Sequence, residues 1–178
     1  MYRLRRAIAR CRRHPVLTTA FAATLIFGAV ASIVADRQIV VNTSPSVMPG
    51  LYIKSSATPE VGCIIDFRIP ELARGYVQAR TGHCGEDWYI LKPIAAGPGD
   101  LVNTTGAALF INGREIAPMP PETDSTGRPL PVWHMARILG PDEFFVFSDR
   151  IPNSFDSRCY GPIHRAQIAA VRRPLITW

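Results

Sequence analysis

ALFINGREIA, residues 108–117, is the stretch of this chain that says most about its fold. Segments 108–111 and 114–117 are rich in apolar residues, and the pair Asn112-Gly113 stands between them. An Asn-Gly pair readily adopts the positive φ angles of a type I′ turn, which joins two antiparallel strands through two residues. The stretch therefore predicts a β-hairpin and, with it, an antiparallel sheet.

The sequence on both sides of this hairpin consists of short apolar segments separated by proline, glycine and polar turns, with 16 Pro and 13 Gly in 178 residues. This pattern is typical of short strands. Further strands are expected at residues 39–41, 50–53, 63–68, 88–91, 100–103 and 144–148. Helical turns are indicated only at 70–79 and 165–170, and the Pro-, Thr-, Asp- and Gly-rich residues 118–131 predict an irregular surface loop. We therefore expect one mainly β domain over residues 37–178.

The amino-terminal part of the chain differs in character from this domain. Residues 16–35 carry no charged side chain and would span roughly 30 Å as a helix, which matches the hydrocarbon core of a bilayer. Residues 1–14 contain six arginines, so the positive-inside rule predicts a cytoplasmic amino terminus and an exported domain. We expect an Arg-rich tail over 1–14 and a single, uncleaved transmembrane helix over 15–36. A cleaved signal peptide is the alternative, because Ala29-Val30-Ala31 has the small-x-small form of a cleavage site.

The net charge of +6 comes from the tail rather than from the exported domain. Without the six arginines of the tail, fourteen basic residues remain against fourteen acidic ones, so the rest of the chain is formally neutral. This distribution argues against nucleic-acid binding. Neither Cys-x-x-Cys nor His-x-x-x-His spacing occurs, so no metal and no cofactor is expected.

Three cysteines, Cys63, Cys84 and Cys159, would face an oxidising compartment after export, whereas Cys11 would stay in the reducing cytoplasm. Three thiols allow one disulfide, and we expect it to join Cys63 to Cys84.

Lysine occurs only at Lys54 and Lys92, beside eighteen arginines. A buried lysine can lose its proton and act as a general base, which an arginine cannot do. The neighbours of Lys92 within residues 90–96 are apolar and include no carboxylate, so burial there would lower the pKa of the amine. Ser46 lies shortly after the apolar amino-terminal segment, and a serine becomes a nucleophile only beside a base. The two residues together suggest a Ser–Lys catalytic dyad.

Three segments, in order along the chain, resemble the serine, lysine and third boxes of type I signal (leader) peptidases. They are Ser46-Val47-Met48-Pro49, Lys92 followed by Gly97-Pro98-Gly99-Asp100, and Asn153-Ser154-Phe155-Asp156-Ser157-Arg158 with Gly161. A closer likeness is to the conjugative-transfer (TraF-type) branch, whose members process pilin precursors. It rests on Asn42-Thr43-Ser44-Pro45-Ser46, Gly50-Leu51-Tyr52, Leu91-Lys92-Pro93, Gly127-Arg128-Pro129-Leu130-Pro131 and Asn153-Ser154-Phe155-Asp156.

The resemblance implies a signal-peptidase-like domain of coiled antiparallel sheets and assigns roles to single residues. Ser46 is the expected nucleophile, and Lys92 is the base that takes its proton and later donates it to the leaving amine. The backbone N–H of Ser46 and the hydroxyl of Ser44 would bind the oxyanion.

The third box supplies the supporting residues of the resemblance. Ser154 would orient the lysine amine, and Asp156 and Arg158 would form a salt bridge with a structural role. This box opens with Ser-Asp-Arg-Ile-Pro at residues 148–152, where the family usually has Gly-Asp-Asn-Arg, so a role for Asp149 stays open.

The sequence as a whole predicts a membrane-anchored serine endopeptidase that removes leader peptides from exported precursors, in particular pilin-type subunits of a conjugative transfer (type IV secretion) system. The expected location is the bacterial inner membrane, with residues 37–178 in the periplasm. Its expected partners are the precursor, membrane lipid and components of the conjugation machinery.

Several alternatives stay open at this point. A housekeeping signal peptidase would differ only in its substrates, and a self-cleaving Ser–Lys regulator would need an internal cleavage site that is not evident. A serine–histidine–aspartate triad could use His83, His134 or His164, but no glycine-flanked serine accompanies them. A non-catalytic, membrane-tethered assembly factor of a secretion or pilus apparatus is the alternative from a different class.

Overall fold

The computed structural model describes residues 15–35, 37–82, 84–85 and 88–178, and the chain divides into two compact units between Val40 and Val41. The first unit contains the helix α2 (Pro15–Ala35), which has 21 residues and no charged side chain. Its described apolar side chains are exposed, among them Phe21 and Phe27. No helix within the described residues is both long and apolar enough to cross a membrane. The predicted Arg-rich tail, residues 1–14, lies outside the described residues.

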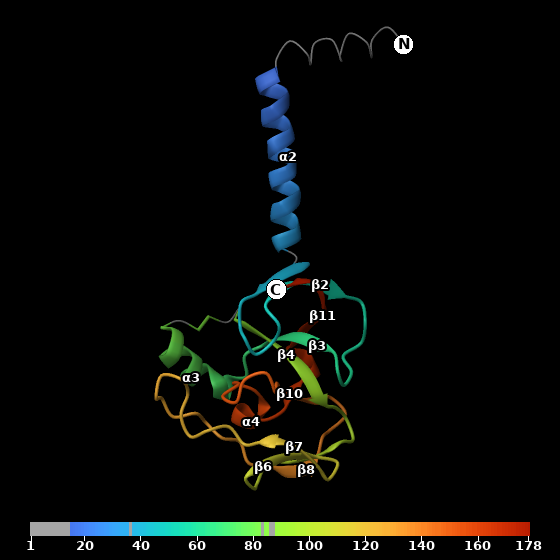
Figure 1. Cartoon of the computed structure of the whole chain (residues 1–178). Helices are drawn as coiled ribbons and strands as arrows, with labels where there is room; N and C mark the ends of the chain where they lie inside the picture. Colours follow the sequence, from blue (N-terminus) through green and yellow to red (C-terminus); the bar gives the residue numbers. More distant parts are fainter. Residues whose placement is uncertain (1–14, 36, 83, 86–87) are drawn as a thin grey trace. The chain divides into compact units, whose positions relative to one another are not determined.

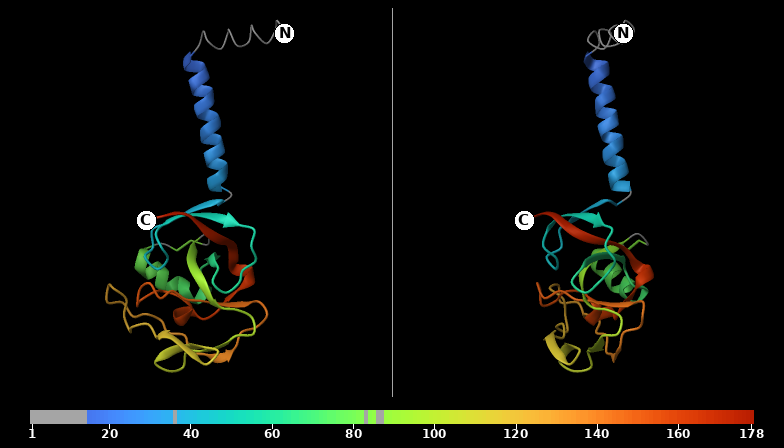
Figure 2. Two further views of the ribbon diagram at one scale, coloured as in Figure 1. Left: turned by 45° about the vertical axis from the view of Figure 1, so that its right-hand side comes forward. Right: turned by 90° about the vertical axis from the view of Figure 1, so that its right-hand side faces the viewer.

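The second unit is built from antiparallel sheets, which confirms the mainly β prediction. Its larger sheet has the strand order β1-β2-β11-β3-β4-β9-β10, and its smaller sheet has the order β7-β6-β5-β8. The strands of the larger sheet are β1 (Ile39–Asn42), β2 (Gly50–Ser55), β3 (Ile64–Arg68), β4 (Tyr89–Ala96), β9 (Glu143–Val146), β10 (Ile163–His164) and β11 (Ile168–Thr177). Those of the smaller sheet are β5 (Leu101–Asn103), β6 (Ala108–Ile111), β7 (Arg114–Pro118) and β8 (Ala136–Ile138). The smaller sheet lies at the end of the unit far from β2 (Figures 1 and 2).

The hairpin predicted from ALFINGREIA is formed by β6 and β7. Ile111 pairs with Arg114, and Asn112 and Gly113 have φ angles of 52° and 78°, as a type I′ turn requires. The side chain of Asn112 also accepts a hydrogen bond from the Leu101 N–H at 2.9 Å. The turn residue therefore ties the hairpin to the neighbouring strand β5.

The helical elements of the second unit are short. The helix α3 (Glu71–Thr81) buries Ala73 and Val77 and ends at Gly82, whose φ of 76° suits a residue without a Cβ. The helix α4 (Ser157–Tyr160) lies within the third box and was not expected. The prediction of a helical turn over residues 165–170 holds only for the 3-10 helix η1 (Arg165–Gln167) and is wrong beyond it, because β11 begins at residue 168.

The unit has two apolar cores. The core of the larger sheet includes Ala73 and Val77 of α3 and Ile69 just before it, and the core beside the smaller sheet combines Val102 and Leu109 with Phe145 of β9. The strand β4 pairs with β3 through residues 89–93 and with β9 beyond them, and it contributes Ile94 to one core and Ala96 to the other. Alternate residues of β4 are buried from Lys92 onward, so its side chain faces the interior of the protein.

Two further predictions need correction. Residues 118–131 are not irregular throughout: Thr123 pairs with Pro129, and the Asp124 carboxylate accepts a 2.7 Å hydrogen bond from the Tyr76 hydroxyl of α3. The expected disulfide is not formed, because Cys63 and Cys84 are both free thiols. Each is half-buried and packs against the core of the larger sheet.

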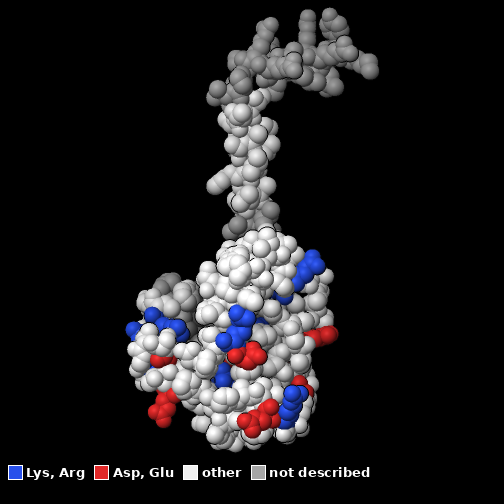
Figure 3. All heavy atoms as spheres, in the orientation of Figure 1, with Lys and Arg blue, Asp and Glu red and all other residues white. Residues whose placement is uncertain are grey.

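Charged side chains of both signs are interspersed over the face of the second unit that Figure 3 shows. That mixture agrees with the formally neutral charge of residues 15–178.

Candidate active site

Ser46, the nucleophile predicted from the sequence, lies in the loop of residues 43–49 that connects β1 to β2, called the nucleophile loop after this prediction. The loop is held from within by the side chain of Asn42, the last residue of β1. Its amide nitrogen lies 3.0 Å, 2.9 Å and 3.1 Å from the carbonyl oxygens of Ser44, Val47 and Met48, and its oxygen accepts from the Ser44 N–H at 3.1 Å. Four backbone groups of a short turn are thereby satisfied by one buried side chain, which fixes the shape of the loop.

The far end of the nucleophile loop is fixed by the sheet. The Tyr52 hydroxyl, on β2, donates to the Met48 carbonyl at 2.6 Å. Gly50 opens β2 opposite β11, and a Cβ at this position would lie 2.2 Å from the carbonyl oxygen of Ile176. Only a glycine allows the two strands to approach this closely.

Lys92 lies in β4 with 3% of its surface exposed, and its Nζ donates to the Ser154 Oγ at 2.8 Å. Burial disfavours the ammonium form and lowers the pKa of this amine from 10.5 to about 8, although the charge of Asp156 partly opposes the shift. Among the described residues the amine forms no ion pair with a carboxylate. A substantial fraction of this lysine is therefore neutral at mildly alkaline pH and able to accept a proton.

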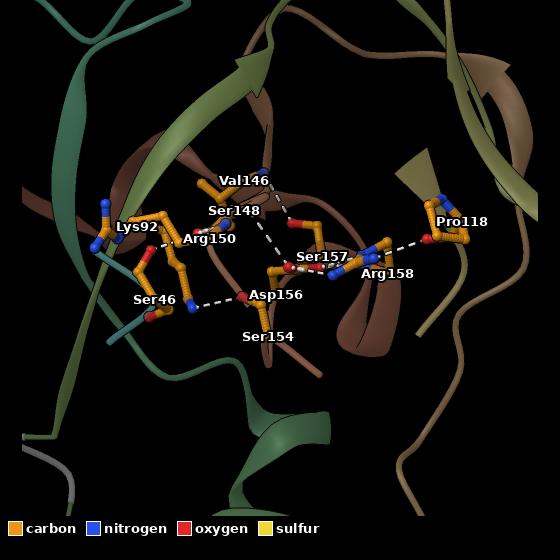
Figure 4. A network of polar contacts seen from close by, with 10 residues as sticks. All are labelled: Ser46, Lys92, Pro118, Val146, Ser148, Arg150, Ser154, Asp156, Ser157 and Arg158. Atoms are coloured by element: carbon orange, nitrogen blue, oxygen red, sulfur yellow. Dashed lines mark hydrogen bonds and ion pairs between the residues drawn. The ribbon is translucent and has the colours of Figure 1, made fainter. Parts of the chain in front are cut away.

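Ser46 is also buried, with 4% of its surface exposed. Its hydroxyl lies 2.9 Å from the hydroxyl of Ser44, and no direct hydrogen bond joins it to Lys92 in the described structure. Figure 4 shows the two side chains next to each other, with the lysine amine reaching past Ser46 to Ser154. The structure thus brings together Ser44, Ser46, Lys92 and Ser154, four of the residues selected from the sequence.

The residues Asp156 and Arg158 form the expected ion pair, with 2.9 Å between Arg158 Nη2 and Asp156 Oδ2. Both side chains are almost fully buried, and a second contact of 2.9 Å joins Arg158 Nε to Asp156 Oδ1. The guanidinium also donates to the Pro118 carbonyl and lies over the Phe147 ring. The pair therefore anchors the third box against the end of β7 and leaves its carboxylate oriented towards Arg158 rather than towards the Lys92 amine (Figure 4).

The opening of the third box contacts the nucleophile loop directly. The Ser148 hydroxyl donates to the Ser46 carbonyl, and Arg150 Nε donates to the Pro45 carbonyl at 3.1 Å. Asp149, whose role the sequence left open, lines the neighbouring cavity.

This cavity has a volume of about 350 Å³ and begins at Ser46. Its walls are mainly apolar and come from the nucleophile loop, β2, β3, β4, β11 and the opening of the third box. The residues are Ser46, Val47, Met48, Tyr52, Ile64, Pro93, Ser148, Asp149, Arg150, Pro174 and Thr177. The space has the size and lining of a site for a few side chains of a peptide.

Asn42, Tyr52 and Ser148 contribute to the site but were not selected from the sequence. An Asn in front of a Thr-Ser-Pro-Ser turn is a signal for side-chain bonding to the turn, so the role of Asn42 could have been found. Tyr52 and Ser148 had no comparable signal, because their partners lie on other elements. Of the candidate triad histidines, His134 bonds the Thr104 carbonyl of the smaller-sheet region, and His83 lies outside the described residues.

Comparisons with known proteins agree with these observations. The family model described as "Signal peptidase, peptidase S26" matches residues 12–178. Two Escherichia coli proteins named "Plasmid transfer protein TraF" are similar to the chain. One is 40% identical over 149 residues, covering 78% of this chain and 82% of the relative, and the other is 37% identical over 148 residues with the same coverage. A solved signal peptidase I from Enterococcus faecalis V583 aligns with a TM-score of 0.39 and 20% identity over 66% of this chain and 98% of that one. The resemblance noted in the three boxes is thereby confirmed, and the chain belongs to the signal peptidase S26 family.

Proposed function

We propose that this chain is a serine endopeptidase with a Ser46–Lys92 dyad that removes leader peptides from exported precursor proteins. Ser46 Oγ attacks the scissile carbonyl while Lys92 Nζ takes the hydroxyl proton. The tetrahedral intermediate collapses, the C–N bond breaks, and the lysine returns the proton to the leaving amine. Water, deprotonated by the same amine, then hydrolyses the ester and restores the serine.

The observation that carries this proposal is the environment of Lys92. Its amine is buried next to the nucleophile loop, has a pKa of about 8, and is held by the Ser154 hydroxyl rather than by a carboxylate. A lysine in a salt bridge would stay protonated and could not serve as a base. Membership of a peptidase family supports the same conclusion.

The Ser46 N–H and the Ser44 hydroxyl are the proposed oxyanion donors. Within the described structure the Ser46 N–H has no hydrogen-bond acceptor, and the Ser44 hydroxyl lies 2.9 Å from the nucleophile oxygen. Loss of one such donor typically costs about 3 kcal/mol of transition-state stabilisation.

We further propose that the precursors are pilin-type subunits of a conjugative transfer system, with small residues next to the cut. The two plasmid transfer relatives and the mainly apolar cavity beside Ser46 support this choice. Residues 1–36 would attach the enzyme to the bacterial inner membrane, with the amino terminus in the cytoplasm and residues 37–178 in the periplasm. Protease accessibility in spheroplasts, and extraction of membranes with alkaline carbonate, test this orientation and attachment.

The function is tested by coexpressing the chain with a candidate pilin precursor and measuring the mass of the product. We expect S46A and K92M each to abolish trimming. The chain offers a matched control in its other lysine, since Lys54 is exposed on β2 and K54M should trim normally. Trimming by S46A or by K92M would refute the dyad. A wild-type chain that leaves every tested precursor intact yet is needed for pilus assembly would favour the non-catalytic assembly factor.

A further inference from the structure

The two peptide bonds that flank Ser46 are both held by side chains from residues 148–150. The carbonyl of the preceding peptide, on Pro45, accepts the 3.1 Å hydrogen bond from Arg150 Nε. The carbonyl of the following peptide, on Ser46 itself, accepts from the Ser148 hydroxyl. Figure 4 shows both donors approaching Ser46 from the same segment.

A hydrogen bond to one carbonyl fixes the orientation of the whole peptide unit that contains it. The peptide bond is planar, and every peptide bond of the described chain is trans, so the N–H of Ser46 points opposite to the carbonyl of Pro45. Rotation of that unit would turn the N–H and carbonyl together. The hydrogen bond from Arg150 opposes this rotation and therefore fixes the direction of the Ser46 N–H.

The clamping segment is itself anchored. Ser148 is 2% exposed, its N–H lies 3.5 Å from Asp156 Oδ2, and its hydroxyl also accepts from the Arg150 N–H at 3.3 Å. Asp156 is in turn fixed by its buried ion pair with Arg158. The two donors are thus connected to the most rigid polar contacts of the third box rather than to a free loop.

We propose that Ser148 and Arg150 clamp the nucleophile, with Arg150 as a positioning residue that aims the Ser46 N–H at the developing oxyanion. This inference rests on the proposed function, because the N–H matters only if Ser46 attacks a carbonyl. The clamp is made by the side chains of Ser148 and Arg150, in the part of the third box that departs from the Gly-Asp-Asn-Arg pattern of the resemblance.

Three substitutions of Arg150 separate the hydrogen bond from the positive charge. R150Q keeps an N–H donor the same number of bonds from Cα as Nε, but removes the charge. R150K keeps the charge but has a methylene at that place, and R150M fills the space with neither. We expect R150M and R150K to lower kcat on the order of tenfold, as loss of one charge-assisted hydrogen bond would, and R150Q to recover most of that rate. R114M, at an exposed arginine of β7, is the matched control and should behave as wild type.

Positioning is distinguished from general damage by a transition-state mimic. A peptide aldehyde forms a tetrahedral adduct with the serine, and its binding needs the oxyanion donor. The peptide product of cleavage forms no such adduct, so its binding does not need that donor. Affinity for the aldehyde should therefore fall in R150M by the same factor as kcat, with KM, product affinity and the pH midpoint of the rate unchanged. S148A should act in the same direction, because the second peptide unit is then released.

The clamp is refuted if R150M keeps the wild-type kcat, if R150K recovers the rate and R150Q does not, or if aldehyde and product affinities fall together. Failure of the proposed function has a different signature, because S46A would then cleave as well as wild type. Cleavage that requires Ser46 and Lys92 but is insensitive to Ser148 and Arg150 would overturn the clamp alone.

Discussion

The amine of Lys92 is buried, which destabilises its charged form. This burial should determine how the rate of cleavage depends on pH. Its pKa is lowered to about 8 by burial, and in the proposed dyad only the neutral amine can take the proton of Ser46. We expect kcat/KM to rise about tenfold per pH unit on the acid side and to level off above pH 8. A pH–rate profile with a fluorogenic peptide measures this midpoint. A midpoint near the ordinary pKa of lysine would show that the amine is not desolvated in the working enzyme.

The same burial opposes folding. The pKa of Lys92 falls from 10.5 to about 8, and at about 1.36 kcal/mol per unit this corresponds to roughly 3 kcal/mol when the lysine is charged. We expect K92M, which fills the space without a charge, to raise the free energy of unfolding at neutral pH by about 1–3 kcal/mol while abolishing cleavage. Urea denaturation of both proteins gives the difference, with K54M as the control.

The sign of this effect can be checked against pH. The folded state binds the lysine proton less tightly than the unfolded state, so wild-type stability should increase as pH rises from about 8 to 10.5. K92M lacks this contribution, and the advantage of the variant should shrink over the same range. If the difference in free energy of unfolding between K92M and wild type stays constant over this pH range, the stability gained in K92M does not come from removing the buried charge.

At this scale the sequence selected residues that the structure brings close together. Ser46, Lys92 and Ser154 were chosen from their order and spacing, and the structure places them in one site. The contacts of Ser148 and Arg150 could not be predicted, because a hydrogen bond across about a hundred residues of chain leaves no local pattern in the sequence.

Among the elements, the contact between β2 and β11 limits which residue can stand at Gly50. A Cβ there would lie 2.2 Å from the Ile176 carbonyl oxygen, so G50A must push the strands apart. We expect a loss of about 1–3 kcal/mol in the free energy of unfolding, together with a lower cleavage rate, since the nucleophile loop ends at this glycine. The comparison variant is G75A in α3, where a Cβ meets nothing within 4 Å and where helix propensity should add roughly 0.5–1 kcal/mol. Equal stabilities of the two variants would contradict the close approach.

The hairpin and the elements missed show what local sequence can and cannot predict. The strands β6 and β7 were found within one residue because the Asn-Gly turn fixes their register through its own φ angles. The strand β11 was missed although it is the longest, because Arg172, Arg173 and Pro174 interrupt its apolar pattern. The central arginine is accommodated by a buried ion pair with Asp66 on β3, which is a tertiary contact.

At the scale of the whole molecule, the two sheets are joined by an ion pair that should respond to acid. Arg137 of β8, in the smaller sheet, lies 2.6 Å from Glu143 of β9, in the larger one. This hydrogen bond lowers the pKa of Glu143 from 4.5 to about 2, so its contribution is present above pH 4.5 and is lost as the pH falls towards 2.

Because the arginine is half exposed, we expect this contribution to be about 1 kcal/mol or less. E143Q should be slightly less stable than wild type at neutral pH, and the difference should vanish on acidification to pH 2. Thermal unfolding followed by circular dichroism across this range measures it. If E143Q is still less stable than wild type at pH 2, Glu143 stabilises the contact between β8 and β9 by packing rather than by its charge.

The order in which the strands are synthesised differs from their order in the larger sheet. β2 and β3 are made early, but the strand between them, β11, ends at Thr177. Until β11 has been made, no strand joins β2 to β3, and Pro174 and Thr177 are missing from the wall of the cavity. A partly synthesised chain therefore already contains Ser46 and Lys92 while the strand that connects their parts of the sheet is still to come. We expect the proposed cleavage activity to appear only after β11 has joined the sheet.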